Sequence, residues 1–207
     1  MKAYKFRGSH QFDMVMDIVL GKRLYCADWA KLNDPMEGVF AYSHNNVTER
    51  DIKQDVEKII NEKKKIRVCS LASTFESHLM WAHYASGFEG FAIEVELPDN
   101  DSKIKKVEYR GIFAGISLGE EIEANQVADE ILSSKYNEWE YEKEIRILSQ
   151  DEYYYLENPI TRIIVGHRMK PALFKAVEII CRNQNITLCR IGIGDMGMDA
   201  DLIWKAD

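Results

Sequence analysis

The sequence predicts an α+β (mixed α/β) fold, with a central mixed sheet flanked by helices in a single domain over residues 1–207. Three observations support this. Short apolar segments alternate with segments of helical periodicity, a strand–helix–strand (βαβ) unit is recognisable near the C-terminus, and no linker separates two halves. A chain of this length buries roughly 70% of its extended surface, so its core needs neither disulfides nor a structural metal.

The first element is a strand at residues 2–7, "KAYKFR". Tyr4 and Phe6 alternate there with Lys5 and Arg7, which is the period of a strand with one buried and one solvated face. We therefore expect the two aromatic rings in the core and the two cations on the opposite side.

A helix, a strand and a loop follow. Ser9 is placed to cap the helix, and Gly21 is expected as its left-handed C-terminal residue. Residues 23–27, "RLYCA", predict a strand. Residues 31–38, "KLNDPMEG", predict a loop, because Asn and Asp bond their own backbone and Pro35 disfavours helix in the residue before it.

The middle of the chain continues the alternation. A helix begins at Thr48 and ends at the lysines 63–65, which suit the negative end of its dipole. Residues 66–73, "IRVCSLAS", predict a buried strand. Ser77 starts a short helix, and residues 90–97, "GFAIEVEL", predict a strand whose apolar side chains face one way.

The last elements form the clearest unit. Residues 105–110 predict a strand, and residues 119–134 a helix. Residues 161–167, "TRIIVGH", predict a strand that leads into a helix with Pro171 in its first turn. The strand "ITLCRIGI" at residues 186–193 completes a βαβ unit.

Composition excludes several classes of protein. The net charge of −7 argues against a protein that coats nucleic acid, although a local basic groove stays compatible with it. No segment approaches the ~20 apolar residues that cross a bilayer, and no secretory signal is recognisable. Cysteines 26, 69, 181 and 189 form no CxxC pattern, which indicates buried thiols in a reducing compartment. We expect a cytoplasmic protein without membrane association, and the sequence does not predict an oligomeric state.

Residues 137–148, "NEWEYEKEIRIL", carry the first candidate site. If a strand begins near residue 141, Glu142, Glu144 and Arg146 share one face, and such a cluster raises one carboxyl pKa while another stays ionised. If the segment is helical, Glu142 and Arg146 form an ordinary ion pair. A substrate-facing cluster and a structural salt bridge both remain open.

The helix that follows Ser77 supplies further candidates. Trp81 and Tyr84 lie one turn apart, so their rings either line a pocket that stacks a base or nicotinamide, or belong to the core. His78 and His83 do not have the i,i+4 spacing of a zinc site, and no metal is predicted. Ser73 has no evident structural role, but no GxSxG motif surrounds it, which argues against a serine hydrolase.

A turn at residues 165–171, "VGHRMKP", offers a weaker anion-binding hypothesis. Gly166, Arg168 and Lys170 lie there between a strand and a helix, where free N–H groups and two cations favour phosphate or carboxylate. The pattern is not one of the established phosphate loops. Residues 191–199, "IGIGDMGMD", precede no helix and so do not form a dinucleotide fingerprint.

Several motifs together resemble the bacterial family named domain of unknown function 2971. They are "YKFR" at 4–7, "LNDPMEG" at 32–38, "CSLAS" at 69–73, "MWAHYASGFEGFAIEVE" at 80–96 and "WEYEKEIRI" at 139–147. The resemblance covers most of the chain, up to "IIVGHRM" at 163–169. It implies no biochemical activity.

A looser similarity is to the ADP-ribosyltransferase core, which uses an Arg or His, then a Ser or aromatic residue, then a late Glu, often as ExE. Arg7, Ser70 or Ser73, and the ExE of Glu142 and Glu144 follow this order, without a full STS triplet. The resemblance implies that Arg7 holds the phosphate or ribose of NAD and that Ser73 positions the nicotinamide ribose. Glu144 would bond the ribose 2′-OH and stabilise an oxocarbenium-like transition state, and Glu142 would orient the acceptor.

These observations predict one polar cleft. Its expected residues are Arg7, Ser73, Trp81, Tyr84, Glu142, Glu144 and Arg146, with Asn33, Asp34 and Glu37 at the rim. The favoured activity is ADP-ribosyl transfer or glycohydrolysis with NAD as the substrate, in a toxin or phage-defence role. The alternative is a non-catalytic nucleotide- or protein-binding module whose Glu/Arg cluster is structural. A third alternative, a Mg²⁺-dependent nuclease or phosphoesterase, lacks an Asp-rich signature.

Overall fold

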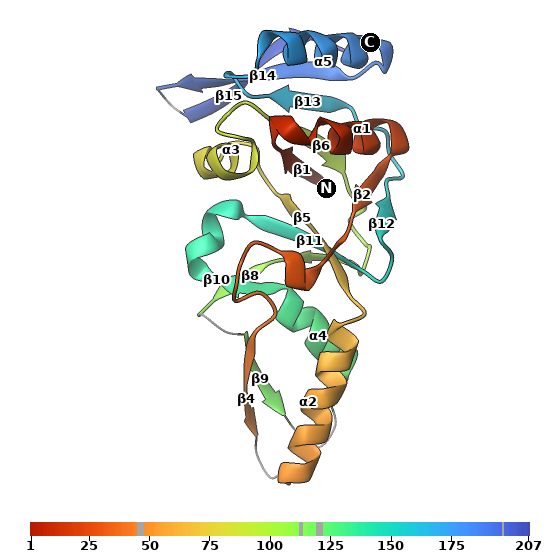
Figure 1. The fold of residues 1–207 in the computed structure, drawn as a ribbon, viewed down its shortest axis with the longest axis vertical. Coiled ribbons are helices and arrows are strands. Elements are labelled where there is room, and N and C mark those ends of the chain that lie inside the picture. Colours follow the sequence, from red (N-terminus) through yellow and green to blue (C-terminus); the bar gives the residue numbers. More distant parts are fainter. Residues whose placement is uncertain (45–47, 112–113, 119–121, 196) are drawn as a thin grey trace.

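The structure is a computed structural model that describes residues 1–44, 48–111, 114–118, 122–195 and 197–207 (Figure 1). Within these residues the main sheet contains nine strands, paired both parallel and antiparallel. Their spatial order is β15 (Gly197–Trp204), β14 (Thr187–Gly194), β13 (Arg162–Val165), β6 (Phe91–Glu96), β1 (Lys2–Arg7), β5 (Arg67–Ala72), β11 (Glu144–Ser149) and β7 (Ile104–Lys106), with β3 (Ala27–Asp28) paired to β5. The predicted α+β fold with a central mixed sheet is confirmed.

Small sheets and helices surround the main sheet. The two-stranded sheets are β10 (Ser134–Tyr136) with β8 (Glu108–Arg110), β12 (Tyr153–Tyr155) with β2 (Arg23–Tyr25), and β4 (Phe40–His44) with β9 (Ala114–Leu118). The α-helices are α1 (Phe12–Gly21), α2 (Glu49–Lys63), α3 (His78–Tyr84), α4 (Ala124–Leu132) and α5 (Pro171–Asn183). Short 3₁₀ helices are η1 (Ser9–Gln11), η2 (Trp29–Lys31) and η3 (Asn137–Glu142). None of the helices in the described part of the chain combines the length and apolarity that a membrane crossing needs.

The main sheet is covered on both faces. Helices α1 and α5 share the larger core with one face, where Val15 and Val177 belong to the same apolar cluster as Ile93 of β6. Figure 1 shows α1 beside β1 and β6. On the other face, Trp81 of α3 packs edge-on against Phe6 of β1 at 5.3 Å between ring centroids. The periodicity of residues 90–97 therefore identified the larger core correctly.

β1 is a central strand, which changes the expected place of its cations. All six residues of β1 pair with β6, and Tyr4 also pairs with Ala72 of β5. Because a central strand is buried on both faces, Lys5 is only 7% exposed, where the sequence placed it in solvent. Its Nζ donates to the carbonyl oxygen of Ser70 at 2.5 Å.

The sheet is split between β1 and β5. Only the pair Tyr4 and Ala72 joins these two strands, so the rest of β1 and the rest of β5 diverge. At the other end of β5, the edge that does not pair with β1 pairs with β3 instead, through Ala27 and Val68. The space between the diverging strands is where the candidate site lies.

An arm extends from the sheet at the lower end of Figure 1 and consists of α2, α4, β4 and β9. The predicted cap of α2 is confirmed, because Oγ1 of Thr48 accepts from the N–H of Asp51 at 3.3 Å. Ile52 and Ile59 of α2 are buried in the arm. The sequence did not predict β4 or β9. The helix expected over 119–134 is α4, and residues 119–121 lie outside the described residues.

Three local predictions were wrong. The left-handed residue after α1 is Lys22, with φ of 50°, and Gly21 is still helical. The strand predicted over 105–110 is interrupted at Val107, between β7 and β8. The strand expected from about residue 141 begins later, at Glu144 (β11), because η3 extends to Glu142, and the alternative of an α-helix is wrong.

The C-terminal βαβ unit is confirmed. β13 and β14 are parallel, with Ile164 opposite Cys189, and α5 connects them with Pro171 at its start. β14 then pairs with β15 in a hairpin that the sequence did not predict. The glycines of residues 191–199 therefore belong to a hairpin.

Gly166, at the end of β13, is required by close packing of the backbone. A Cβ added there would overlap the carbonyl oxygen of Phe88. The N–H of Gly166 donates to Gly90 at 2.9 Å, and the N–H of Arg168 donates to that same Phe88 oxygen at 3.0 Å. The turn therefore lies flat against the segment before β6, and only a residue without a side chain fits.

We expect Gly166→Ala to lower the free energy of unfolding by about 1–3 kcal/mol, because the backbone must move to relieve the overlap. Gly115→Ala in β9 is the matched control, since nothing lies within 4 Å of a Cβ there. It should change stability by less than about 0.5 kcal/mol. Urea unfolding of both variants measures the difference, and equal midpoints would contradict the packing argument.

Candidate functional site

A cavity of about 420 Å³ lies at the split between β1 and β5. Its lining comes from β1, α1, β5, α3, β10, η3, β11 and the loop before β4. Six residues that the sequence singled out line it together: Arg7, Asn33, Tyr84, Glu142, Glu144 and Arg146. Segments from both halves of the chain thus meet around one hollow.

Arg146 of β11 is fully buried and organises one wall. Its Nη1 and Nη2 donate to the two carboxylate oxygens of Glu37, at 2.5 and 2.8 Å. Its Nε and Nη2 donate to the two oxygens of Glu144, both at 2.9 Å. Nη1 also donates to the carbonyl oxygen of Leu132 at 2.7 Å. The planar guanidinium therefore holds two carboxylates at once, each in two-point contact.

Lys135 extends this wall toward the loop before β4. Its Nζ lies 2.6 Å from Oε2 of Glu142 and 3.4 Å from Oε2 of Glu144. The hydroxyl of Tyr84 donates to Glu142, and Nδ2 of Asn33 donates to the Tyr84 oxygen at 2.5 Å. A continuous set of polar contacts therefore runs from Asn33, at the exposed rim, to the buried strand β11.

The charges of this wall are fixed by their neighbours. Burial raises the pKa of Glu144, but the positive charges of Arg146 and Lys135 outweigh it and lower that pKa to about 2. Burial raises the pKa of Glu37 despite its bonds to Arg146. Burial and the bond to Glu142 raise the pKa of the Tyr84 hydroxyl. Glu144 is therefore ionised and Tyr84 protonated at neutral pH.

The wall formed by β1 carries two cations, Lys5 and Arg7, that form no ion pair with a carboxylate among the described residues. Lys5 is buried and donates to the Ser70 carbonyl, and its Nζ lies 3.7 Å from Sγ of Cys69. The Nε of Arg7 is buried and has no hydrogen-bond partner among the described residues. Burial lowers the pKa of both groups, because the protein around each positive charge replaces only part of the hydration that water would give it.

The lining is positive in a protein that is negative as a whole. Five cations line the cavity, against two carboxylates, Glu142 and Glu144. The cations are Lys5, Arg7, Lys31, Lys135 and Arg146. Because the whole chain carries −7, this excess is local, and it favours an anionic ligand.

Four other predicted residues lie elsewhere. Trp81 is fully buried, its Nε1 donates to the Phe75 carbonyl at 2.7 Å, and its expected role in ligand binding is wrong. Ser73 is exposed and does not line the cavity, whereas Ser70 does. Asp34 is buried and accepts from the N–H of Met36 in a turn. Glu37 lies behind Arg146, so it supports the wall without lining it.

The sequence missed three cations of the site, Lys5, Lys31 and Lys135. Lys5 was assigned to solvent because it alternates with aromatic residues, which is correct for a strand with one buried face only. Lys135 precedes the charged segment by a few residues, and no pattern marked it. The nearby run of glutamates was the available signal, since buried carboxylates require cations within reach.

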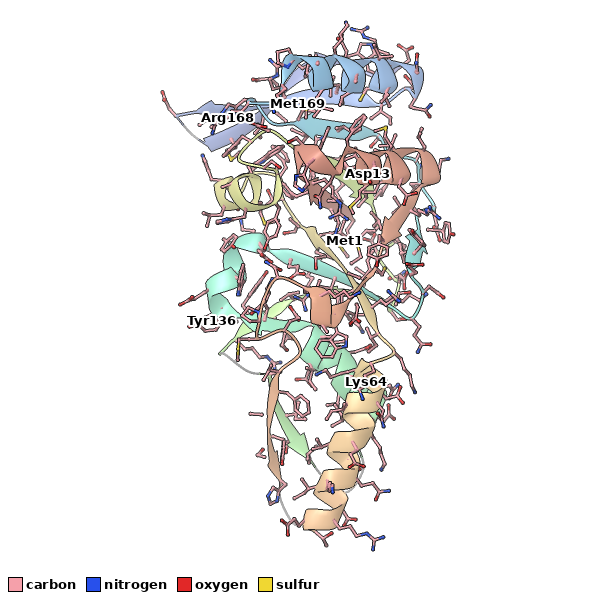
Figure 2. All side chains as sticks on the ribbon, viewed as in Figure 1. Met1, Asp13, Lys64, Tyr136, Arg168 and Met169 are labelled. Atoms are coloured by element: carbon pink, nitrogen blue, oxygen red, sulfur yellow. The ribbon has the colours of Figure 1, made fainter. Side chains whose placement is uncertain are left out.

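The anion hypothesis for residues 165–171 stays a prediction, with fewer free N–H groups in the turn than the sequence suggested. The N–H groups of Gly166, Arg168 and Met169 already donate to main-chain carbonyls, at 2.9, 3.0 and 3.2 Å, and Pro171 at the start of α5 has no N–H. Figure 2 shows Arg168 and Met169 well apart from Tyr136, which adjoins η3 and the cavity. This turn is a packing element of the sheet.

A second cavity of about 320 Å³ adjoins the first, because Arg7, Met14 and Tyr25 line both. Asp13 (labelled in Figure 2) and Tyr153 line it beyond Arg7. Among the described residues, no group of three or more His, Cys, Asp or Glu side chains is placed to hold a metal ion.

Comparison with known proteins finds no matching family model, no matching curated protein and no matching solved structure. The resemblances to the bacterial family and to the ADP-ribosyltransferase core therefore stay predictions. Function is therefore inferred from the site itself.

Arg146→Met should lower the free energy of unfolding by about 3–5 kcal/mol, because it leaves Glu37 and Glu144 buried without their cation. Arg110→Met is the matched control. Arg110 pairs with two carboxylates at the surface, so its loss should cost less than about 1 kcal/mol. Denaturant unfolding compares the two, and similar losses would show that the buried pairs contribute no more than the surface ones.

Stability should fall as the pH drops from about 4.5 toward 2. The pKa of Glu144 is about 2 in the folded protein against an ordinary value of 4.5, so in this range the unfolded chain binds the extra proton. Glu144→Gln removes this contribution. Urea midpoints of the wild type and the variant, measured through this range, should converge as the pH falls. Parallel curves would contradict an ionised, cation-held Glu144.

Proposed function

We propose that this protein is an enzyme that binds NAD in the cavity at the split and cleaves its nicotinamide–ribose bond, passing the ADP-ribosyl group to water or to an acceptor. The observation that carries the proposal is the convergence of Arg7, Glu142 and Glu144 on one hollow with walls of different character. One wall offers uncompensated cations, and the other offers a fixed carboxylate. A ligand with both an anionic and a glycosidic part fits such a site.

The cation wall accounts for the anionic part of the ligand. Arg7 and Lys5 lie at the split without carboxylate partners among the described residues. The Nε–H of Arg7 donates no hydrogen bond to the described residues and can therefore donate one to a ligand. A pyrophosphate accepts hydrogen bonds from such groups and repays the cost of their burial. A neutral ligand would leave both cations uncompensated.

The carboxylate wall accounts for the bond that breaks. In nicotinamide cleavage the electron pair of the C1′–N bond passes to the ring nitrogen, the pyridinium becomes neutral, and positive charge develops on the ribose. Glu144 is ionised and held in place by Arg146 and Lys135, so it stabilises that charge without reorganising. Water or an acceptor nucleophile then bonds to C1′ and gives up its proton.

Glu142 and Tyr84 are placed to receive the second reactant. The Tyr84 hydroxyl donates to Glu142, and Asn33 holds Tyr84 from the rim. This pair lies where the loop before β4 meets η3, at the entrance side of the network. A nucleophile that enters there meets a carboxylate able to accept a hydrogen bond from it.

The dimensions favour an extended ligand. The main cavity holds about 420 Å³, and the adjoining one adds a further hollow on the other side of Arg7. A dinucleotide that spans both would place its pyrophosphate beside Arg7 and one base near Tyr25, which lines both hollows. The looser ADP-ribosyltransferase similarity and the proposed bacterial toxin or phage-defence role agree with this arrangement.

A second candidate function is a non-catalytic binding module. It is favoured by the saturation of the carboxylates, since both oxygens of Glu144 are engaged by Arg146 and one is shared with Lys135. In that case the network is structural and the cation wall binds a nucleotide or an acidic segment of a partner. Such a protein binds NAD without releasing nicotinamide, which separates the two candidates.

Glu144→Gln should lower nicotinamide release from NAD by at least about 100-fold, because the fixed negative charge beside the ribose is lost. Glu140→Gln, two residues before Glu142 and exposed, is the matched control and should retain wild-type activity. Circular dichroism of each variant confirms that it is folded. If the wild type releases no nicotinamide with any acceptor, or if Glu144→Gln is fully active, the enzyme is not of this class.

Arg7→Gln should weaken NAD binding by about tenfold or more, because an anionic ligand loses its charged donor. Arg50→Gln on α2 removes an equal charge from an exposed position and should leave the dissociation constant unchanged. Isothermal titration at two salt concentrations measures both. An equal effect of the two substitutions would mean that overall charge, and not the cavity, governs binding.

A further inference from the structure

Two cysteines lie opposite each other at the edge of the split. β3 pairs with β5 through Ala27 with Val68 and Asp28 with Arg67, in antiparallel register. β3 begins at Ala27, and continuing its register by one residue sets Cys26 against Cys69, in agreement with a hydrogen bond between the two thiols. Directly opposed residues on antiparallel strands have Cα atoms ~4.5–5.5 Å apart, which falls within the range that a disulfide spans. Both residues are buried, with exposed fractions of 0% and 1%.

The surroundings of Cys69 favour its reactive form. A hydrogen bond from the Cys26 thiol lowers the pKa of Cys69, burial raises it, and the charges of Lys5 and Arg7 lower it further, to about 6. The hydrogen bond and burial raise the pKa of Cys26. One thiolate and one thiol in contact are the two reactants from which a disulfide forms.

A small oxidant can approach through the cavity. Val68 and Ser70 flank Cys69 and both line the hollow, and so does Ala27, next to Cys26. Lys5, which contacts Sγ of Cys69, also lines it. Lys5 therefore connects the Cys69 thiol with the hollow, and a small neutral oxidant needs to pass only this side chain.

We propose that Cys26 and Cys69 form an oxidation site that closes to an intramolecular disulfide with a peroxide as the oxidant. The Cys69 thiolate attacks one peroxide oxygen, the O–O bond breaks, and hydroxide leaves with Cys69 oxidised to the sulfenic acid. Sγ of Cys26 then attacks the sulfenic sulfur, the S–S bond forms, and the released hydroxyl takes up the Cys26 proton as water. The net change is two thiols and one hydrogen peroxide to one disulfide and two waters.

The bond has two structural consequences. It removes the thiol against which Lys5 is held, so this cation keeps only the Ser70 carbonyl and one wall of the cavity changes. It also closes a loop over residues 26–69, which contains η2, β4 and α2. The bond joins two positions of the main sheet and restricts the unfolded chain between them.

The experiment treats the folded full-length protein with hydrogen peroxide, removes the peroxide, and then alkylates the remaining thiols in denaturant, because all four cysteines are buried in the folded protein. Of the four cysteines, two should become inaccessible to alkylation until a reductant is added, and peptide mass spectrometry should link Cys26 to Cys69. The oxidised protein should melt roughly 5 °C or more higher than the reduced protein, and the shift should reverse with reductant.

Internal controls are available in the same chain. Cys181 lies in α5, and Cys189 faces Leu202, so neither has a cysteine opposite and both should stay alkylatable. Cys181→Ser should form the same disulfide, and Cys69→Ser should form none. Oxidation of the exposed Met14 shows that peroxide reached the protein. Four free thiols after Met14 is oxidised, or any other cysteine pairing, would overturn the proposal.

Discussion

The guanidinium of Arg146 is the group on which the site depends. It is fully buried, and its two-point contacts with Glu37 and Glu144 draw the loop before β4 against the face of β11. A buried arginine of this kind contributes little net stability when paired and is costly when one partner is missing, so its value lies in fixing positions. Here it fixes the carboxylate that faces the cavity. Lys135 contacts this fixed Glu144 and also binds Glu142.

The split in the main sheet creates the cavity that this network of charged side chains lines. Had β1 and β5 paired along their whole length, the backbone would fill the space that the cavity occupies. Lys5 spans the gap with a hydrogen bond to Ser70, so the opening carries a positive group where a sheet would carry backbone bonds. The fold thus produces a polar hollow in the middle of its own core, with helices supporting both sides.

The sequence predicted correctly that the acidic segment 137–148 contributes to a charged cluster, but it did not predict that the segment is a 3₁₀ helix followed by a strand. The alternation of Glu144, Ile145 and Arg146 gave the right face for a strand, because a period of two is preserved wherever a strand lies. Glu142 joins the same site through a different geometry, at the end of a 3₁₀ helix, which no periodicity describes. The aromatic residues beside Glu142 in the sequence suggested that an aromatic ring would contact it. The ring that does so is Tyr84, which comes from α3.

The errors have a common physical origin. Lys5 was placed by its alternation with aromatic residues and Trp81 by the character of its ring, whereas their true positions follow from what packs around β1. Strand neighbours far apart in the chain are set by tertiary packing, and a single sequence carries little information about them. The same holds for β4 and β9, two short strands that pair with each other from distant parts of the chain. β15 is a different case, because it has eight residues and pairs with the strand just before it. The βαβ unit was predictable because its strands and helix are consecutive.

The loop that connects the cavity to the arm has a mechanical consequence. At one end Asn33 holds Tyr84, and four residues later Glu37 grips Arg146. The next residue, Gly38, accepts a hydrogen bond from Lys63 at the end of α2. Any force on the arm is therefore transmitted within a few residues to both the rim and the floor of the pocket. The position of α2 and the position of the Glu37 carboxylate are therefore coupled through two adjacent residues of one loop.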